Sequence, residues 1–302
     1  MSDARISLDQ GPTTAAVRVG DVTIAEYVHT PDAPASEAPK PYLYPLRSLS
    51  GAPLSVYRPW DHRWHKGLQM TWSHVSGENF WGGPTFALGE GYRWIDNLGR
   101  MEHRGFSSAG ADGTEVVLEE DLDWITSRGE HWVREHRRHR FHGVDVERGL
   151  WILDFSTTLE NVADRDLAFG SPTTHGREAA GYAGLFWRGP RSWTGAVSFG
   201  PDGTGGEDLM GAVAPWIAMA GEHDEIDGGG TVLAFAGTSS ADVPIKWFFR
   251  SEPFAVISPS PSFDEEILLP PGGTVELTHR YVFIDHAADR AHVEALAEEL
   301  AP

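Results

Sequence analysis

Cysteine is absent from the 302-residue sequence, and its absence excludes several kinds of chemistry. The chain can form no disulfide bond, use no thiolate nucleophile and build no thiolate zinc site. A reducing cytoplasm is compatible with this composition. The N-terminal residues 1–7 also lack the basic-then-apolar pattern of a secretory signal. We therefore predict a cytoplasmic protein.

Positive charge is scarce. The chain has 24 Lys and Arg against 44 Asp and Glu, a formal net charge of -20. Nucleic acids and anionic membranes need a basic surface, so neither is expected as a partner. The balance favours a neutral or cationic ligand. Because no run of 18 apolar residues occurs, we also predict no transmembrane helix.

Helical periodicity is nearly absent, whereas the signals of β-structure recur throughout. The sequence contains 34 Gly and 12 Trp, and short segments with period-two alternation are separated by Gly- and Pro-containing turns. These segments are 5–9, 15–19, 22–27, 115–125, 131–142, 151–159, 184–188, 213–220, 232–236, 245–249, 254–257 and 275–284. Only residues 287–302 show an apolar stripe at helical spacing. The pattern predicts one all-β domain over residues 1–302, a large antiparallel sandwich with a short C-terminal helix.

Two segments have distinctive compositions. Residues 31–40, rich in Pro, Ala, Ser and Glu, are expected to form a mobile polar loop. The His- and Arg-rich strand 131–142 follows the acidic strand 115–125, and we expect its cations on a solvated face, paired with those acids, rather than at a metal or phosphate site. Edge strands of large sandwiches can pair between subunits, so a homodimer is compatible with the sequence.

Chemically active residues are densest in one short stretch, Asp61-His62-Arg63-Trp64-His65-Lys66-Gly67-Leu68. It lies between extended segments, where a rigid frame can present functional side chains. The aromatic and Gly-rich segment 79–83 follows, and it could line a cleft beside the two imidazoles. The alternative is a polar loop whose imidazoles bond to the backbone.

The motif Asp61-His-x-x-His-Lys-Gly-Leu68, with Gly184-Leu-Phe-Trp-Arg188 and the segment from Glu252 to Ile284, resembles the bacterial PmoA-like family, named for methane oxygenation. Membrane methane oxygenation needs a membrane-embedded copper enzyme, so that activity is not expected here. More distantly, Leu269-Pro-Pro-Gly-Gly followed by Arg280-Tyr-Val-Phe283 is similar to the galactose-mutarotase-like superfamily. That resemblance implies a large antiparallel β-supersandwich and acid–base isomerisation of a sugar or sugar-derived metabolite.

The resemblance also implies residue roles. Glu252 would be the base, His175 the acid, and His65, with His62 beside it, would hold a hydroxyl. A base and an acid facing each other across a cleft can move protons on an anomeric centre, and each transfer is worth about 10²–10⁴-fold. Trp81 and Trp187 could stack on the ring, and Arg58 or Arg188 could bind hydroxyls or a carboxylate. Asp61 and Lys66 complete the candidate substrate-binding set.

Two other interpretations use the same residues. His62, His65 and His175, with Asp61 or Glu252, could ligate Zn²⁺, Mn²⁺ or Fe²⁺ in a lyase, isomerase or hydrolase acting on an oxidised sugar. Without metal or turnover, a Trp-rich sandwich could be a carbohydrate-binding module, with a small-molecule carbohydrate as its partner. Converging titratable groups would favour an enzyme over a module.

Overall fold

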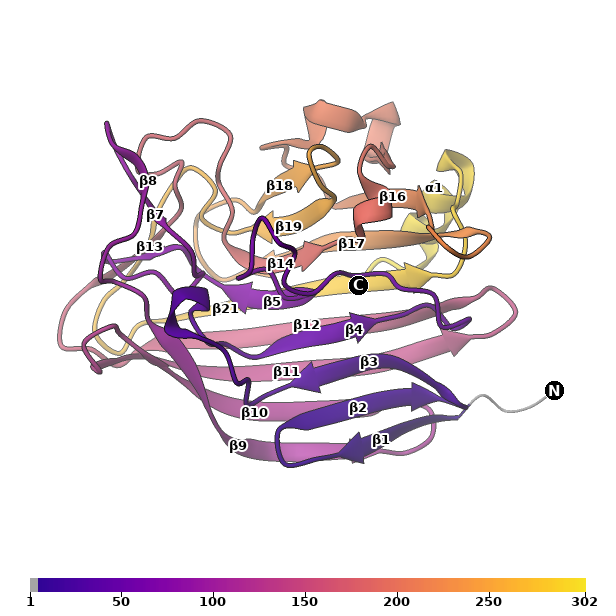
Figure 1. The fold of residues 1–302 in the computed structure, drawn as a ribbon, viewed down its shortest axis with the longest axis horizontal. Coiled ribbons are helices and arrows are strands. Elements are labelled where there is room, and N and C mark those ends of the chain that lie inside the picture. The colour runs from indigo at the N-terminus through magenta and orange to yellow at the C-terminus, as the bar shows by residue number, and fades with distance from the viewer. Residues whose placement is uncertain (1–4) are drawn as a thin grey trace.

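The computed structural model describes residues 5–302, and two eight-stranded antiparallel sheets form its body (Figure 1). Sheet 1 has the order β1-β2-β3-β4-β5-β14-β19-β18. Its strands are Ile6–Gln10 (β1), Thr14–Val19 (β2), Val22–Val28 (β3), Tyr42–Leu46 (β4), Leu68–Thr71 (β5), Gly184–Arg188 (β14), Val256–Ser260 (β19) and Lys246–Arg250 (β18).

Sheet 2 has the order β15-β16-β17-β21-β12-β11-β10-β9 and faces sheet 1. Its strands are Val197–Phe199 (β15), Trp216–Glu222 (β16), Gly229–Ser239 (β17), Thr274–Ile284 (β21), Leu150–Asn161 (β12), His131–Asp145 (β11), Val116–Ile125 (β10) and Arg100–Ala111 (β9). In Figure 1 the indigo strands β1–β4 cross in front of the magenta strands β9–β12.

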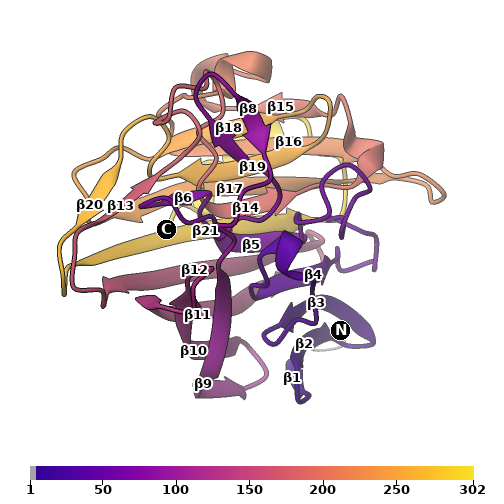
Figure 2. The ribbon, with the colours of Figure 1, turned by 60° about the vertical axis from the view of Figure 1, so that its left-hand side comes forward.

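Smaller elements lie around the two main sheets. A three-stranded sheet contains Ile267–Leu269 (β20), Leu167–Gly170 (β13) and His74–Val75 (β6), and a hairpin contains Thr85–Ala87 (β7) and Gly91–Arg93 (β8). Short 3₁₀ turns occupy Ala35–Glu37 (η1), Arg191–Trp193 (η2), Pro201–Gly203 (η3) and Gly206–Leu209 (η4). The β7–β8 hairpin projects beyond the sheets (Figures 1 and 2).

The predicted all-β sandwich with a short C-terminal helix is confirmed. The helix α1 (Arg290–Glu299) begins after Asp289, whose carboxylate accepts a hydrogen bond from the His292 amide, as an N-cap should. It packs Val293 and Leu296 on sheet 2. No helix within residues 5–302 has both the length and the hydropathy needed to span a membrane.

Alternation gives sheet 1 two apolar faces. On β14, Leu185 and Trp187 enter the main core between the sheets, while Phe186 belongs to a separate cluster on the outer face. On β18, Trp247 and Phe249 point to the core, and Phe248 joins that outer cluster. Successive side chains on a strand point to opposite faces. The outer face of sheet 1 is therefore also apolar, and other segments cover it.

Residues 31–40 differ from the mobile loop expected from their composition. Glu37 and Lys40 are buried. The Glu37 carboxylate accepts hydrogen bonds from Arg58, the shortest at 2.6 Å, and pairs with Lys66. Lys40 donates to two backbone carbonyls of the same segment. These contacts anchor the segment to the body through ionic partners that lie far away in the sequence.

Odd- and even-numbered residues of the His/Arg-rich strand β11 lie on opposite faces of sheet 2. Arg138 pairs with Glu119 of β10 and Arg140 with Glu115, the residue before β10, as expected for a solvated face. The opposite face is buried and carries a charge that the sequence interpretation did not place there. Arg137 binds Glu135 through two hydrogen bonds of 2.7 and 2.9 Å inside the sandwich.

Candidate active site

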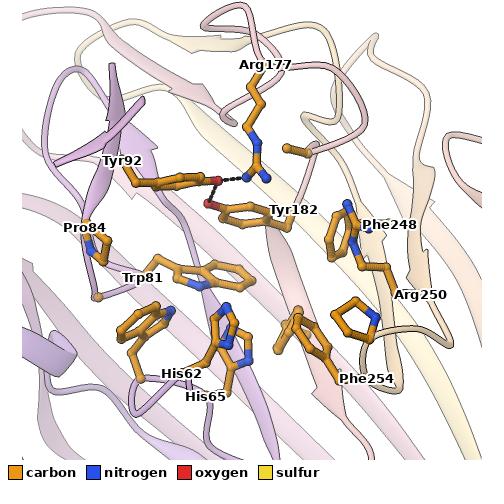
Figure 3. A pocket seen from close by; sticks show the side chains of 15 residues that line it. His62, His65, Trp81, Pro84, Tyr92, Arg177, Tyr182, Phe248, Arg250 and Phe254 are labelled. Atoms are coloured by element: carbon orange, nitrogen blue, oxygen red, sulfur yellow. Dashed lines mark hydrogen bonds between the residues drawn. The ribbon is translucent and has the colours of Figure 1, made fainter. Parts of the chain in front are cut away.

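A cavity of about 400 Å³ lies on the outer face of sheet 1 (Figure 3). This size is within the usual range for small-molecule sites. Strands β14 and β18 form its base, and the segment after Pro59, the β7–β8 hairpin and the loop before β14 enclose it. The lining residues are His62, Trp64, His65, Trp81, Gly82, Pro84, Tyr92, Arg177, Ala180, Tyr182, Phe186, Phe248, Arg250, Pro253 and Phe254.

Two imidazoles lie side by side in this cavity. The rings of His62 and His65 are 4.7 Å apart between centroids, with planes at 20°. A tight turn holds them, because the His65 amide donates to the His62 carbonyl and the Arg58 amide donates to the His65 carbonyl. The three-residue spacing read from the sequence thus brings both rings to one wall, below Trp81 in Figure 3.

Gly67 ends this turn. Its φ is +60°, and an added Cβ would lie 2.2 Å from the Leu43 carbonyl oxygen. The Gly67 amide also donates to the Val56 carbonyl. Only glycine fits this backbone conformation and this close approach.

Gly67→Ala is therefore expected to lower the free energy of unfolding by about 3 kcal/mol, combining left-handed strain with a backbone clash. Gly20 is the matched control, since its φ is +56° but nothing lies within 4 Å of the added Cβ. Gly20→Ala should lower it by only about 1 kcal/mol. Urea unfolding of both variants measures the difference, and equal losses would show that the clash is relieved.

Each imidazole has a different charged neighbour. His62 Nδ1 lies 3.2 Å from Asp61 Oδ2. His65 Nδ1 lies 3.2 Å from Nη1 of Arg188, which is fully buried and packs over the Phe254 ring at 3.6 Å. Arg188 reaches Asp61 at 3.8 Å, and Arg191 also pairs with Asp61. Asp61 and Arg188 therefore sit behind the histidines as an opposed pair of charges.

Burial and these charges keep both imidazoles neutral at neutral pH. Burial lowers the pKa of His62, Asp61 offsets part of that change, and Arg188 and Arg191 lower the pKa further. Burial, His62 and Arg188 together hold the pKa of His65 well below its usual value. Burial also lowers the pKa of Arg188, to about 10, so its guanidinium stays charged.

Aromatic rings form most of the remaining wall. Trp81 packs against Tyr182 and Phe186, with ring centroids 4.6 and 4.7 Å apart. Tyr92, from the β7–β8 hairpin, has its hydroxyl 2.8 Å from that of Tyr182, and Arg177 donates to the same Tyr92 hydroxyl. Figure 3 shows this trio at the end of the cavity opposite the histidines.

The structure brings only some of the sequence-predicted residues to this cavity. His62, His65 and Trp81 line it, and Asp61 and Arg188 lie directly behind the imidazoles. Arg58 and Lys66 are instead bound to Glu37, so their charges serve to anchor the 31–40 segment.

Trp187 is not placed for stacking on a ligand in this cavity. It is fully buried in the main core, and its indole N–H donates to the Leu54 carbonyl at 2.9 Å. The physical reason is strand parity, because its neighbours Phe186 and Arg188 occupy the outer face. Six of the twelve tryptophans are among the largest fully buried side chains, so the high Trp content mainly reflects the core.

The two residues expected as acid and base are not assembled with the histidine pair. Glu252 is exposed and lines a second cavity with Glu207, although its neighbours Pro253 and Phe254 line the first. His175 stacks on His74, with centroids 4.1 Å apart, and its Nδ1 lies 3.0 Å from the Ser171 carbonyl oxygen. That contact stabilises the loop that contains both His175 and Ser171.

The alternative metal set is likewise dispersed. His175 does not join His62 and His65, and Glu252 faces another cavity. Across residues 5–302, no three His, Asp or Glu side chains are grouped as a metal site would require. The predicted ligands therefore do not fit a shared ion.

Several cavity residues were missed from the sequence, notably Arg177, Tyr182, Phe248 and Arg250. For β18 a signal was available. In Lys246-Trp-Phe-Phe-Arg250, alternation places Phe248 and Arg250 on the face opposite the core tryptophan. For Arg177 and Tyr182, which lie in a loop, no periodic signal exists.

Comparison with known proteins places the chain in a family. Residues 14–298 match the model of a family of unknown function, DUF6807. The chain belongs to this family. None of the curated proteins compared with the chain matches it. The family match gives no support to the methane-oxygenase name expected from the sequence.

Three solved structures are distantly similar. A GH36 alpha-galactosidase from Geobacillus stearothermophilus has 11% identity and a TM-score of 0.36, covering 94% of this chain and 41% of the other. A protein assigned as an aldose 1-epimerase from Klebsiella pneumoniae has 14% identity and a TM-score of 0.38, covering 95% and 80%. A TPR-domain containing protein from Parabacteroides distasonis has 11% identity and a TM-score of 0.32, and the match covers 93% of this chain and 47% of the other. The chain thus spans less than half of the alpha-galactosidase, and likenesses this remote carry no argument about activity.

Proposed function

We propose that the protein catalyses acid–base isomerisation of a carbohydrate bound in the aromatic cavity, with His62 as general base and His65 as hydrogen-bond donor. One observation carries this proposal. Two imidazoles lie side by side at a cavity wall, and their charged neighbours Asp61 and Arg188 favour opposite tautomers. A module that only binds sugar has no need of such a pair.

The tautomers follow from the partners. The negative charge of Asp61 Oδ2 lies 3.2 Å from His62 Nδ1, so it favours the proton on that nitrogen and leaves Nε2 with a lone pair. A guanidinium only donates, so Arg188 favours an unprotonated His65 Nδ1 and a proton on Nε2. His65 Nε2 makes no hydrogen bond to any residue among 5–302. The pair thus offers one acceptor and one donor to a ligand.

On a cyclic sugar, this pair can open and close the ring. His62 Nε2 takes the proton of the anomeric hydroxyl while the bond between the anomeric carbon and the ring oxygen breaks. The electron pair of that bond goes to the ring oxygen, which His65 Nε2–H and the charge of Arg188 behind it stabilise. The proton on His62 then passes to the ring oxygen, giving the open-chain aldehyde. Closure on the other face of the carbonyl reverses these steps and yields the other anomer.

The cavity walls suit this ligand. Trp81, Tyr182 and Phe186 line the cavity, and their apolar surfaces can contact the C–H groups of a pyranose with little loss of side-chain freedom. Ring opening passes through an aldehyde that water would hydrate, and an apolar wall keeps water away.

Nuclear magnetic resonance of anomer exchange tests the proposal directly. D-glucose, D-galactose, D-glucuronate and D-galacturonate are each followed by saturation transfer between anomers, with and without protein. Faster exchange for at least one sugar supports the proposal. Binding of these sugars without faster exchange of any would instead identify a carbohydrate-binding module.

The pKa of His62 predicts the pH dependence of that activity. The base works only when neutral, and its pKa in the folded protein lies below the usual 6.5. As pH falls, the inflection in kcat/KM should therefore lie below pH 6.5. A rate profile from pH 8 to pH 4.5 measures this. An inflection at or above pH 6.5 would contradict the assigned environment of His62.

A further inference from the structure

The ionisable groups of the cavity are unbalanced in charge. Its lining includes His62, His65, Arg177 and Arg250, but neither Asp nor Glu. The whole chain carries a net charge of -20, so a site with cations and no carboxylate runs against the composition. An apolar wall strengthens the field of such cations, because water screens them less.

Arg177 has spare donor capacity. It donates one hydrogen bond to the Tyr92 hydroxyl and stacks over the Tyr92 ring at 4.6 Å. Within residues 5–302 it forms no ion pair with a carboxylate. A guanidinium has five N–H donors in a planar fork, so most of its donors remain for a ligand.

Arg250 lies on the neighbouring wall and is similarly placed. Its Nη2 donates to the Ala179 carbonyl at 3.1 Å, and its guanidinium is 5.5 Å from the Phe248 ring centroid. Burial lowers the pKa of Arg250, and the charge of Arg177 lowers it further, while Glu207 in the second cavity offsets part of this. Arg250 also lines the second cavity with Glu207 and Glu252, but within residues 5–302 it forms no salt bridge with either.

Two guanidiniums that line one cavity, with no Asp or Glu in its lining, favour an anion at that place. We propose that Arg177 and Arg250 bind an oxyanion group of the substrate, a carboxylate or a phosphate, so that the substrate is an acidic sugar. The sugar part of this inference rests on the proposed function. Figure 3 shows Arg177 at the end of the cavity away from the histidines, so the anion and the reacting carbon would occupy opposite ends of the bound molecule.

Calorimetric titration with matched pairs of sugars tests the inference. The probes are D-galacturonate and D-galactose 6-phosphate, each compared with D-galactose. The wild-type protein should bind one of the two anions at least tenfold more tightly than galactose, and the better anion identifies carboxylate or phosphate as the group. Charged hydrogen bonds of this kind lead us to expect about a 10- to 100-fold loss of that affinity in Arg177→Gln or Arg250→Gln.

The variants also have matched controls. Arg165→Gln removes an arginine that stacks on Trp132 at 4.4 Å, outside the cavity lining, and should leave anion affinity unchanged. The urea unfolding midpoint of Arg177→Gln should match that of wild type, which separates loss of anion recognition from misfolding. Anion binding that equals galactose binding, or that survives both substitutions, would overturn the inference.

The same experiments distinguish failure of the proposed catalysis from failure of the anion site. Arginine-dependent binding of galacturonate without anomer exchange would preserve the anion site and refute the catalysis. Anomer exchange of galactose and galacturonate at equal efficiency would support the catalysis and refute the anion site.

Discussion

Replacing His62 with Gln is expected to lower kcat for anomer exchange by about 10²–10⁴-fold, the usual contribution of a general base. The reason is that glutamine retains a polar group of similar reach but cannot accept and release a proton. Affinity for the same sugar should change little, because Trp81, Tyr182 and Phe186 still form the wall. Saturation transfer gives kcat, and calorimetry gives affinity.

Glu252→Gln is the informative control for that variant. The family resemblance implies that Glu252 is the base, whereas the structure exposes it in a second cavity. Because Glu252 is an exposed side chain outside the first cavity, we expect Glu252→Gln to keep turnover within about twofold of wild type. Loss of turnover in Glu252→Gln with retention in His62→Gln would reverse the assignment and favour the mechanism implied by the resemblance.

Replacing Glu135 with Ala is expected to lower the free energy of unfolding by about 3–5 kcal/mol, the usual result of breaking a buried ion pair on one side. Glu135 and Arg137 are both buried between the sheets. The Glu135 carboxylate also accepts hydrogen bonds from Trp124 and Thr157, each at 2.8 Å. Its removal leaves a buried guanidinium without its anion and two further donors without a partner.

The surface pair between Glu119 and Arg138 provides the control on the same two strands. Because both side chains are about one-third exposed, Glu119→Ala should lower stability by no more than about 1 kcal/mol. Urea denaturation of both variants, followed by tryptophan fluorescence, measures the two losses. If the losses were equal, the interior of the sandwich would be hydrated enough to screen Arg137.

The sequence was sufficient to predict the fold class because its cues are local. Alternation and Gly- or Pro-containing turns identify strands such as 151–159, and the apolar stripe after residue 287 identifies α1. The Asp61 to Gly67 stretch was also found locally, since its two imidazoles are three residues apart and one turn presents both. These predictions needed no partner from elsewhere in the chain.

Predictions failed where a distant partner decides the role of a residue. Arg58 and Lys66 were expected to bind substrate, but Glu37, more than twenty residues earlier, binds both. His175 and Glu252 fit superfamily positions in sequence, yet their loops point them at His74 and at a second cavity. Trp187 and Arg188 differ for a simpler reason, because one step along β14 changes the face of the sheet.

The net charge of the chain did not predict the charge of the cavity lining. The excess of acids favoured a neutral or cationic ligand, yet the lining gathers arginines from β18 and from the loop before β14. Most acids are solvated on the surface, where salt screens them over about 8–10 Å. A few cations in the lining of a cavity can therefore determine which ligand a strongly acidic protein selects.

The central claim is that His62 and His65 are neutral imidazoles of opposite tautomer, and long-range ¹H–¹⁵N correlation spectra of the histidine rings test it most directly. The His62→Gln and His65→Gln variants assign the two ring systems. At pH 7 we predict a proton on Nδ1 alone for His62 and on Nε2 alone for His65. Two identical tautomers, or a doubly protonated ring at either position, would contradict the proposed division between base and donor.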